Sequence, residues 1–134
     1  MKALISHRPG GPETLVLEEV PDPVPKTGEV LLRVEAVGVN FPDGLFIRDL
    51  YQLKLARPFS PGGELCGVVE ALGPQATGLA VGDRVIARSG WGAMAQRIAL
   101  PVDRCVPIPA DAPAEEAAAL LYTYATAYHA LHDA

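Results

Sequence analysis

The sequence has few cysteines, no long apolar run and no cluster of positive charge, and each absence excludes a class of protein. Two cysteines, Cys66 and Cys105, do not make a disulfide framework, so we expect reduced thiols and a cytoplasmic protein. No apolar stretch reaches the length of about 18 residues that a membrane-spanning helix needs. The first residues, MKALISHRPGG, lack the apolar segment of a secretory signal.

The charge balance is acidic, with a formal net charge of −5 and no run of Lys or Arg. This balance argues against nucleic acid or an anionic membrane as a partner. The 134 residues, 49% of them hydrophobic, are enough for one domain with a core. The 13 glycines and 13 prolines fall between short apolar runs, which is typical of strands joined by tight turns.

The alternation of apolar and polar residues predicts a mainly β domain with helices at its C-terminal end. Glu29 to Val39 is the clearest strand, because Val30 and Leu32 fall on the face opposite Arg33. Further strands are expected at residues 2–7, 15–20, 64–72, 84–87, 92–100 and 105–109. Helices are expected at residues 41–50, 113–121 and 123–132. Strands followed by terminal helices predict a β-barrel-like domain with a helical tail.

Five stretches, in this order and spacing, resemble the quinone oxidoreductases, a zinc-independent type within the medium-chain dehydrogenase/reductase superfamily. They are MKAL with GGPETLVLEEVPDP, GEVLLRVEAVGVNFPD, PGGELCGVVEALG, GLAVGDRV and AEEAAALLYTYATAYHAL. The resemblance covers nearly the whole chain. It implies a GroES-like fold, a distorted antiparallel β-barrel with C-terminal helices, over residues 1–122. Residues 123–134 would then begin the crossover to a nucleotide-binding domain.

The glycine-rich turn that a dinucleotide site needs is not expected within this chain. One string, Gly90-Trp-Gly-Ala-Met-Ala95, fits the pattern loosely, but Pro101 follows too soon for a complete helix and returning strand. The resemblance places this string in a strand of the GroES-like domain. We therefore expect the chain to be the N-terminal part of a longer enzyme, inactive by itself.

The resemblance also predicts that no zinc is bound. The related zinc alcohol dehydrogenases hold the catalytic metal with a Cys and a His at the positions of Asn40 and Gly63, whereas catalytic zinc requires three converging protein ligands. Glu64 alone makes no site. Cys66 lies in an apolar run and is expected in the core. His129 and His132 lie three residues apart on an expected helix and are interpreted as a solvated face.

Without a metal, the implied reaction is hydride transfer from NADPH to a quinone or an α,β-unsaturated carbonyl, with the protein orienting the acceptor and stabilising its negative charge. By resemblance, Asn40 lies at the interdomain cleft beside the nicotinamide. Asp43 either takes part in the pocket or caps and braces its loop. The resemblance, and nothing else in the sequence, implies NADPH as the cofactor. It also implies that the parent enzyme is a homodimer.

Three further residues are candidates for the site. Tyr51 resembles a tyrosine beside the substrate in related enoyl reductases; it is either a proton donor or a half-buried aromatic residue. Thr126 matches a residue near the nicotinamide carboxamide, or is an ordinary helix residue. Trp91, with Tyr51, is a candidate wall of an apolar acceptor pocket.

Three other functions compete with this hypothesis. One is a freestanding GroES-like binding module without catalysis, which would not need the crossover helices. Another is a co-chaperonin, disfavoured because the sequence shows no long mobile loop. The third is a zinc-type alcohol dehydrogenase, which the residues at positions 40 and 63 oppose.

Overall fold

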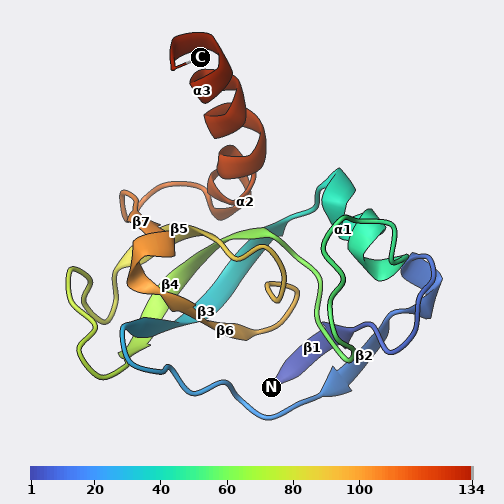
Figure 1. Cartoon of the computed structure of the whole chain (residues 1–134). Coiled ribbons are helices and arrows are strands. Elements are labelled where there is room, and N and C mark those ends of the chain that lie inside the picture. Colours follow the sequence, from blue (N-terminus) through green and yellow to red (C-terminus); the bar gives the residue numbers. More distant parts are fainter. Residues whose placement is uncertain (134) are drawn as a thin grey trace.

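Two antiparallel sheets form the framework of the computed structural model, which describes residues 1–133 (Figure 1). Ala134, the last residue of the expected crossover segment, lies outside them. The small sheet pairs β1 (Lys2–Ile5) with β2 (Val16–Glu19). The large sheet has the order β6-β3-β4-β5-β7, formed by β3 (Glu29–Gly38), β4 (Glu64–Leu72), β5 (Arg84–Arg88), β6 (Arg97–Pro101) and β7 (Cys105–Pro107).

The predicted mainly β fold with short helices is confirmed. Within residues 1–133 the two sheets do not close into one continuous barrel. Isolated bridges, Ala3 to Ala95 and Ser6 to Phe59, connect the small sheet to the loops around the large one. Strand β4 has the predicted bounds. The strand expected from Gly92 begins only at Arg97, because Gly92 has a φ of 99°, outside the extended region.

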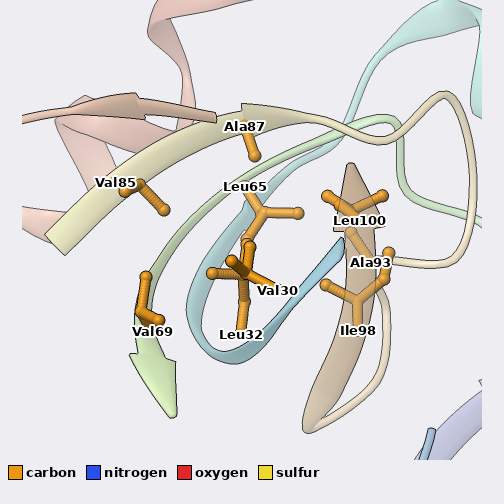
Figure 2. Close-up of a cluster of buried hydrophobic side chains, with 9 residues drawn as sticks. All are labelled: Val30, Leu32, Leu65, Val69, Val85, Ala87, Ala93, Ile98 and Leu100. Atoms are coloured by element: carbon orange, nitrogen blue, oxygen red, sulfur yellow. The ribbon is translucent and has the colours of Figure 1, made fainter. Parts of the chain in front are cut away.

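The core lies against the large sheet and is built from aliphatic side chains (Figure 2). Val30 and Leu32 from β3 and Leu65 from β4 are fully buried, with 0% of their surface exposed. Each such side chain contributes about 1.5–3 kcal/mol of hydrophobic stabilisation. The other members of the cluster are Val69, Val85, Ala87, Ala93, Ile98 and Leu100. The inward face predicted for Val30 and Leu32 is therefore confirmed.

The helices are shorter than the sequence predicts. Helix α1 (Phe41–Ile47) ends before Asp49, whose φ of 57° is incompatible with continuing the helix. Short 3-10 turns are η1 (Pro12–Thr14) and η2 (Val102–Arg104). The C-terminal segment consists of α2 (Ala114–Ala118), the π-helical turn η3 (Leu121–Ala125) and α3 (Thr126–His132).

The C-terminal helical segment touches the sheet at one end only. Ala118 of α2 packs on Cys66 of β4 and Ile86 of β5, whereas α3 projects away from both sheets (Figure 1). The sequence predicted separate helices at residues 113–121 and 123–132; the structure joins them through the π turn. None of the helices in residues 1–133 has the length and apolar character of a membrane span.

Candidate functional site

The loop between β3 and α1 is held in place by Asp43. Its Oδ2 accepts a hydrogen bond from the backbone N–H of Asn40 at 2.8 Å, and its Oδ1 accepts one from the N–H of Gly62 at 3.2 Å. Asn40 and Asp43 form a capping box at the start of α1. Burial raises the pKa of the Asp43 carboxyl, and the two backbone donors oppose this shift. Asp43 thus braces the loop, one of the two roles that the sequence left open.

Glu64 is the centre of the site. Its side chain is 2% exposed and lies between the Asn40 loop and the C-terminal helical segment. Oε1 accepts a hydrogen bond from Nδ2 of Asn40 at 2.9 Å. Oε2 accepts hydrogen bonds from the backbone N–H groups of Leu121 at 3.0 Å and Tyr122 at 3.1 Å. These three donors compensate a carboxylate that is taken out of water.

The same contacts explain the π-helical turn. A π turn interrupts the regular hydrogen bonding of a helix, and such turns occur often at functional sites. Here the N–H groups of Leu121 and Tyr122 donate to Glu64. One carboxylate therefore couples β4, the Asn40 loop and η3.

Glycines give η3 the space to approach this closely. At Gly63, a Cβ atom would meet the phenol of Tyr122, with its Cζ only 2.9 Å away. At Gly38, a Cβ atom would lie 2.7 Å from the carbonyl oxygen of Ala118. Position 63 cannot carry a side chain while Tyr122 occupies this place.

Tyr122 is one of the residues that line a cleft of about 600 Å³. Burial is the main cause that raises the pKa of its hydroxyl, and the negative charges of Asp43 and Glu64 act in the same direction, as does Tyr51. The guanidinium of Arg88 opposes this shift. The full lining is Tyr51, Arg88, Asp103, Arg104, Val106, Leu121, Tyr122, Ala125, Thr126 and His129.

The structure brings the sequence-predicted residues together in groups. Tyr51 and Thr126 share the Tyr122 cleft, and the ring of Tyr51 also packs on Phe46 at 4.5 Å between centroids. Asn40 and Asp43 line a separate, apolar groove of about 650 Å³ beside α1. Trp91 lines neither; it lies in a smaller pocket of about 340 Å³ with Ile98 and Leu100.

The structure also tests the interpretation of the possible metal ligands. Cys66 is fully buried, as predicted for a core residue. His129 is exposed and lies 3.1 Å from Asp133, one turn further along the same helix face. Among residues 1–133, no three His, Cys, Asp or Glu side chains converge in a way that would hold a metal ion.

Sequence reasoning missed Tyr122 and Arg88 and undervalued Glu64. A signal existed for Glu64, since an acid inside the apolar strand β4 and directly after two glycines requires buried hydrogen-bond donors. No local signal marked Tyr122, because its position depends on contacts with residues about 60 positions earlier in the chain.

Residues 26–110 match the alcohol dehydrogenase GroES-like domain, and the chain belongs to this family. Similar proteins include quinone oxidoreductases and VAT-1 homologues. Human quinone oxidoreductase is 37% identical over 134 residues, which cover 98% of this chain and 40% of that protein. The mouse synaptic vesicle membrane protein VAT-1 homolog-like is 36% identical, with 99% of this chain and 32% of that protein covered.

Solved structures agree with this assignment. The crystal structure of the human VAT-1 homolog-like protein superimposes with a TM-score of 0.95 at 36% identity, covering 99% of this chain and 43% of that one. The quinone oxidoreductase from Thermus thermophilus, solved also as its NADPH complex, gives 0.84 at 42% identity, covering 99% and 41%. The resemblance to the quinone oxidoreductase type is confirmed. The chain spans about a third to two fifths of the length of these curated relatives.

Proposed function

We propose that this chain is the acceptor-side domain of an NADPH-dependent quinone or enone reductase that works without zinc. The observation that carries the proposal is the cleft lined by three hydroxyl-bearing residues, Tyr51, Tyr122 and Thr126. Glu64 joins this cleft to the Asn40 loop, because it accepts hydrogen bonds from Asn40 and from the backbone of Tyr122. The solved relatives that are described with NADPH support the choice of cofactor.

The donor set does not suit zinc. A catalytic zinc needs three protein ligands with nitrogen, sulfur or carboxylate donors. Asn40 offers only an amide, Gly63 offers nothing, and both oxygens of Glu64 already accept hydrogen bonds. The acceptor must then be activated by hydrogen bonds alone, which suits quinones and conjugated carbonyls better than simple alcohols or ketones.

The residues present do suit a nicotinamide. When bound, the reduced ring would supply the hydride. The Thr126 hydroxyl takes part in no hydrogen bond among residues 1–133 and is exposed to the cleft. Nδ2 of Asn40 makes only a long hydrogen bond of 3.5 Å to the carbonyl oxygen of Gly38 besides its bond to Glu64, and Oδ1 can accept a hydrogen bond. These two side chains would orient the carboxamide, and Tyr51 would form a wall of the acceptor site.

Exposed apolar side chains on the C-terminal segment favour a two-domain enzyme over a freestanding module. Tyr124, Tyr128 and Leu131 are 69%, 63% and 81% exposed, and a further domain would cover them. The cheapest test is the downstream reading frame. A strand followed by a glycine-rich turn within the next few dozen codons supports the reductase, and a stop codon supports the module.

The decisive test is enzymatic. The longer protein should oxidise NADPH with quinones or enones and should not use ethanol as its main substrate with NADP. Asn40→Ala should lower the rate with every acceptor, whereas the 134-residue chain alone should show no activity above the blank. Ethanol oxidation as the main activity would contradict the proposal.

A further inference from the structure

The Tyr122 phenol occupies the place that position 63 leaves empty. Its oxygen lies where a side chain on Gly63 would begin, and Tyr122 also lines the cleft. Glu64 holds it there through the backbone N–H of Tyr122 at 3.1 Å. Because this hydrogen bond uses the backbone N–H of Tyr122, it leaves the side-chain hydroxyl available for other hydrogen bonds.

The hydroxyl of Tyr122 is free to donate. Within residues 1–133, the Tyr122 hydroxyl makes no hydrogen bond. Every fully buried side-chain nitrogen or oxygen atom in these residues has a hydrogen-bond partner, so the Tyr122 hydroxyl is not fully buried. A half-buried tyrosine that lines a cleft of about 600 Å³ and whose hydroxyl has no partner among residues 1–133 is suited to meet a ligand oxygen. Tyr51, the donor suggested by the sequence, lines the same cleft but packs its ring on Phe46.

The guanidinium of Arg88 is placed to stabilise a phenolate on Tyr122. Arg88 lies opposite Glu64 on the neighbouring strand and also lines the cleft. Among residues 1–133 it takes part in no ion pair, unlike Arg57, Arg84 and Arg97, which pair with carboxylates. Its positive charge acts on Tyr122 against the charges of Asp43 and Glu64 and against Tyr51.

We infer that Tyr122 is the hydrogen-bond and proton donor to the carbonyl oxygen of a quinone or enone bound in this cleft, with Arg88 stabilising the phenolate. The inference rests on the proposed reductase function and names its acid. When bound, the reduced nicotinamide would supply a hydride for the new C–H bond at the β-carbon of an enone, and the π electrons would move to the carbonyl oxygen. The phenol O–H bond breaks, its proton forms the enol O–H, and water returns a proton to the phenolate.

The phenol of Tyr122 is protonated at neutral pH, and its raised pKa makes it a weaker acid, which the guanidinium of Arg88 counteracts. Removing the positive charge of Arg88 should raise the pKa of Tyr122 further, since Arg88 opposes the shift that burial, Asp43, Glu64 and Tyr51 produce. In Arg88→Ala, the tyrosine titration followed by ultraviolet absorption should therefore show one tyrosine that ionises at higher pH than in the unmodified chain. Arg8→Ala, at an exposed position in the turn after β1, is the matched control and should leave the titration unchanged.

The direct test uses the 134-residue chain and needs no turnover. The probe is p-dimethylaminocinnamaldehyde, an enal whose absorption band moves to longer wavelength when its carbonyl oxygen accepts a hydrogen bond. The unmodified chain and Tyr51→Phe should both show this shift. Tyr122→Phe should lose it and bind the probe about threefold to tenfold more weakly, as expected for one hydrogen bond. Circular dichroism confirms that each variant is folded.

Gly63→Ala provides a second route to the same result. Its Cβ would displace the phenol, so the shift should fall even though every hydroxyl is still present. A shift that survives in Tyr122→Phe but disappears in Tyr51→Phe would assign the donor to Tyr51 and overturn the inference. Binding without any shift, or no binding up to the solubility of the probe, would overturn it too.

The two proposals fail differently. A Tyr122-dependent shift in a protein that never oxidises NADPH would refute the reductase function but leave the carbonyl-binding donor in place. NADPH oxidation that is unaffected by Tyr122→Phe would do the reverse.

Discussion

The five-stranded sheet and the C-terminal helical segment, residues 114–132, differ in how far their apolar side chains are exposed. Leu32 and Leu65 in the sheet are 0% exposed, whereas Tyr128 and Leu131 on α3 are 63% and 81% exposed. The sheet therefore carries its own stabilisation. The helical segment depends on a small patch under Ala118 and on the hydrogen bonds to Glu64.

This difference places the site at the junction between a rigid part and a loosely held part. Local opening is easiest where few apolar contacts are buried. Tyr122 and Thr126 belong to the loosely held segment, and Asn40 and Glu64 are attached to the sheet. The Glu64 carboxylate is thus the main polar link that keeps the two halves of the site in register.

The largest expected effect is in the sheet. Leu65→Ala should lower the free energy of unfolding by about 2–5 kcal/mol, because it removes a fully buried side chain and leaves a cavity. Leu131→Ala on α3, the same substitution at an exposed site, should change it by less than about 0.5 kcal/mol. Urea unfolding followed by circular dichroism measures both. Equal losses would show that α3 is packed against the rest of the chain in solution.

The next effect is at the junction. In Glu64→Gln, a neutral amide replaces the carboxylate, so the three charge-assisted hydrogen bonds become weaker. If its oxygen keeps the two backbone N–H groups, its NH2 faces Nδ2 of Asn40, and the Asn40 amide must rotate to offer Oδ1. The free energy of unfolding should fall by about 1–3 kcal/mol. Hydrogen exchange at the amides of Leu121 and Tyr122 should accelerate more than exchange within β4.

The control for this variant is Glu115→Gln, which removes an exposed charge from the first turn of α2. It should leave exchange at Leu121 and Tyr122 unchanged. If Glu64→Gln exchanges at these two amides as slowly as the unmodified chain, the helical segment is held by its apolar contacts alone.

The same division explains what could be predicted from the sequence. Strand β4 follows from a buried apolar run and the inward face of β3 from local alternation, and both predictions are confirmed. The π turn is not local, because its N–H groups bond to a residue 57 positions earlier. The early end of α1 and the late start of β6 depend on backbone conformations at Asp49 and Gly92 that periodicity does not report.

The candidate site divides similarly. Asn40 and Asp43 are neighbours in sequence, so a resemblance in one loop finds both. Tyr51 and Thr126 are found by resemblance, and the structure places them in one cleft. Tyr122 is invisible to such reasoning, because what distinguishes it is the missing side chain of Gly63. The roles of these five residues, Asn40, Asp43, Tyr51, Tyr122 and Thr126, in binding or catalysis stay predictions.

The smallest expected effect is on the labelling rates of the two thiols. Cys105 reports on the edge of the sheet, and Cys66 reports on the contact between the sheet and the helical segment. Cys105 lies at the edge of the sheet on β7, and burial, with a smaller contribution from Asp103, raises its pKa to about 11. At pH 8 only about one thiol in a thousand is then ionised, and the thiolate is the reactive form. Labelling of Cys105 by a disulfide reagent such as DTNB should be slow and should accelerate about tenfold per pH unit up to about pH 11. The raised pKa stabilises the fold below pH 9.0, and this contribution is lost as the pH rises towards about 11.

Cys66 should behave differently, because it is fully buried beneath Ala118 of α2. It should react only when the helical segment opens, so its labelling rate should rise in Glu64→Gln while that of Cys105 stays the same. The single variants Cys66→Ser and Cys105→Ser assign the two rates. Equal labelling of both thiols in the unmodified chain would mean that the helical segment detaches freely, and Glu64 would then not be the link between the two halves of the site.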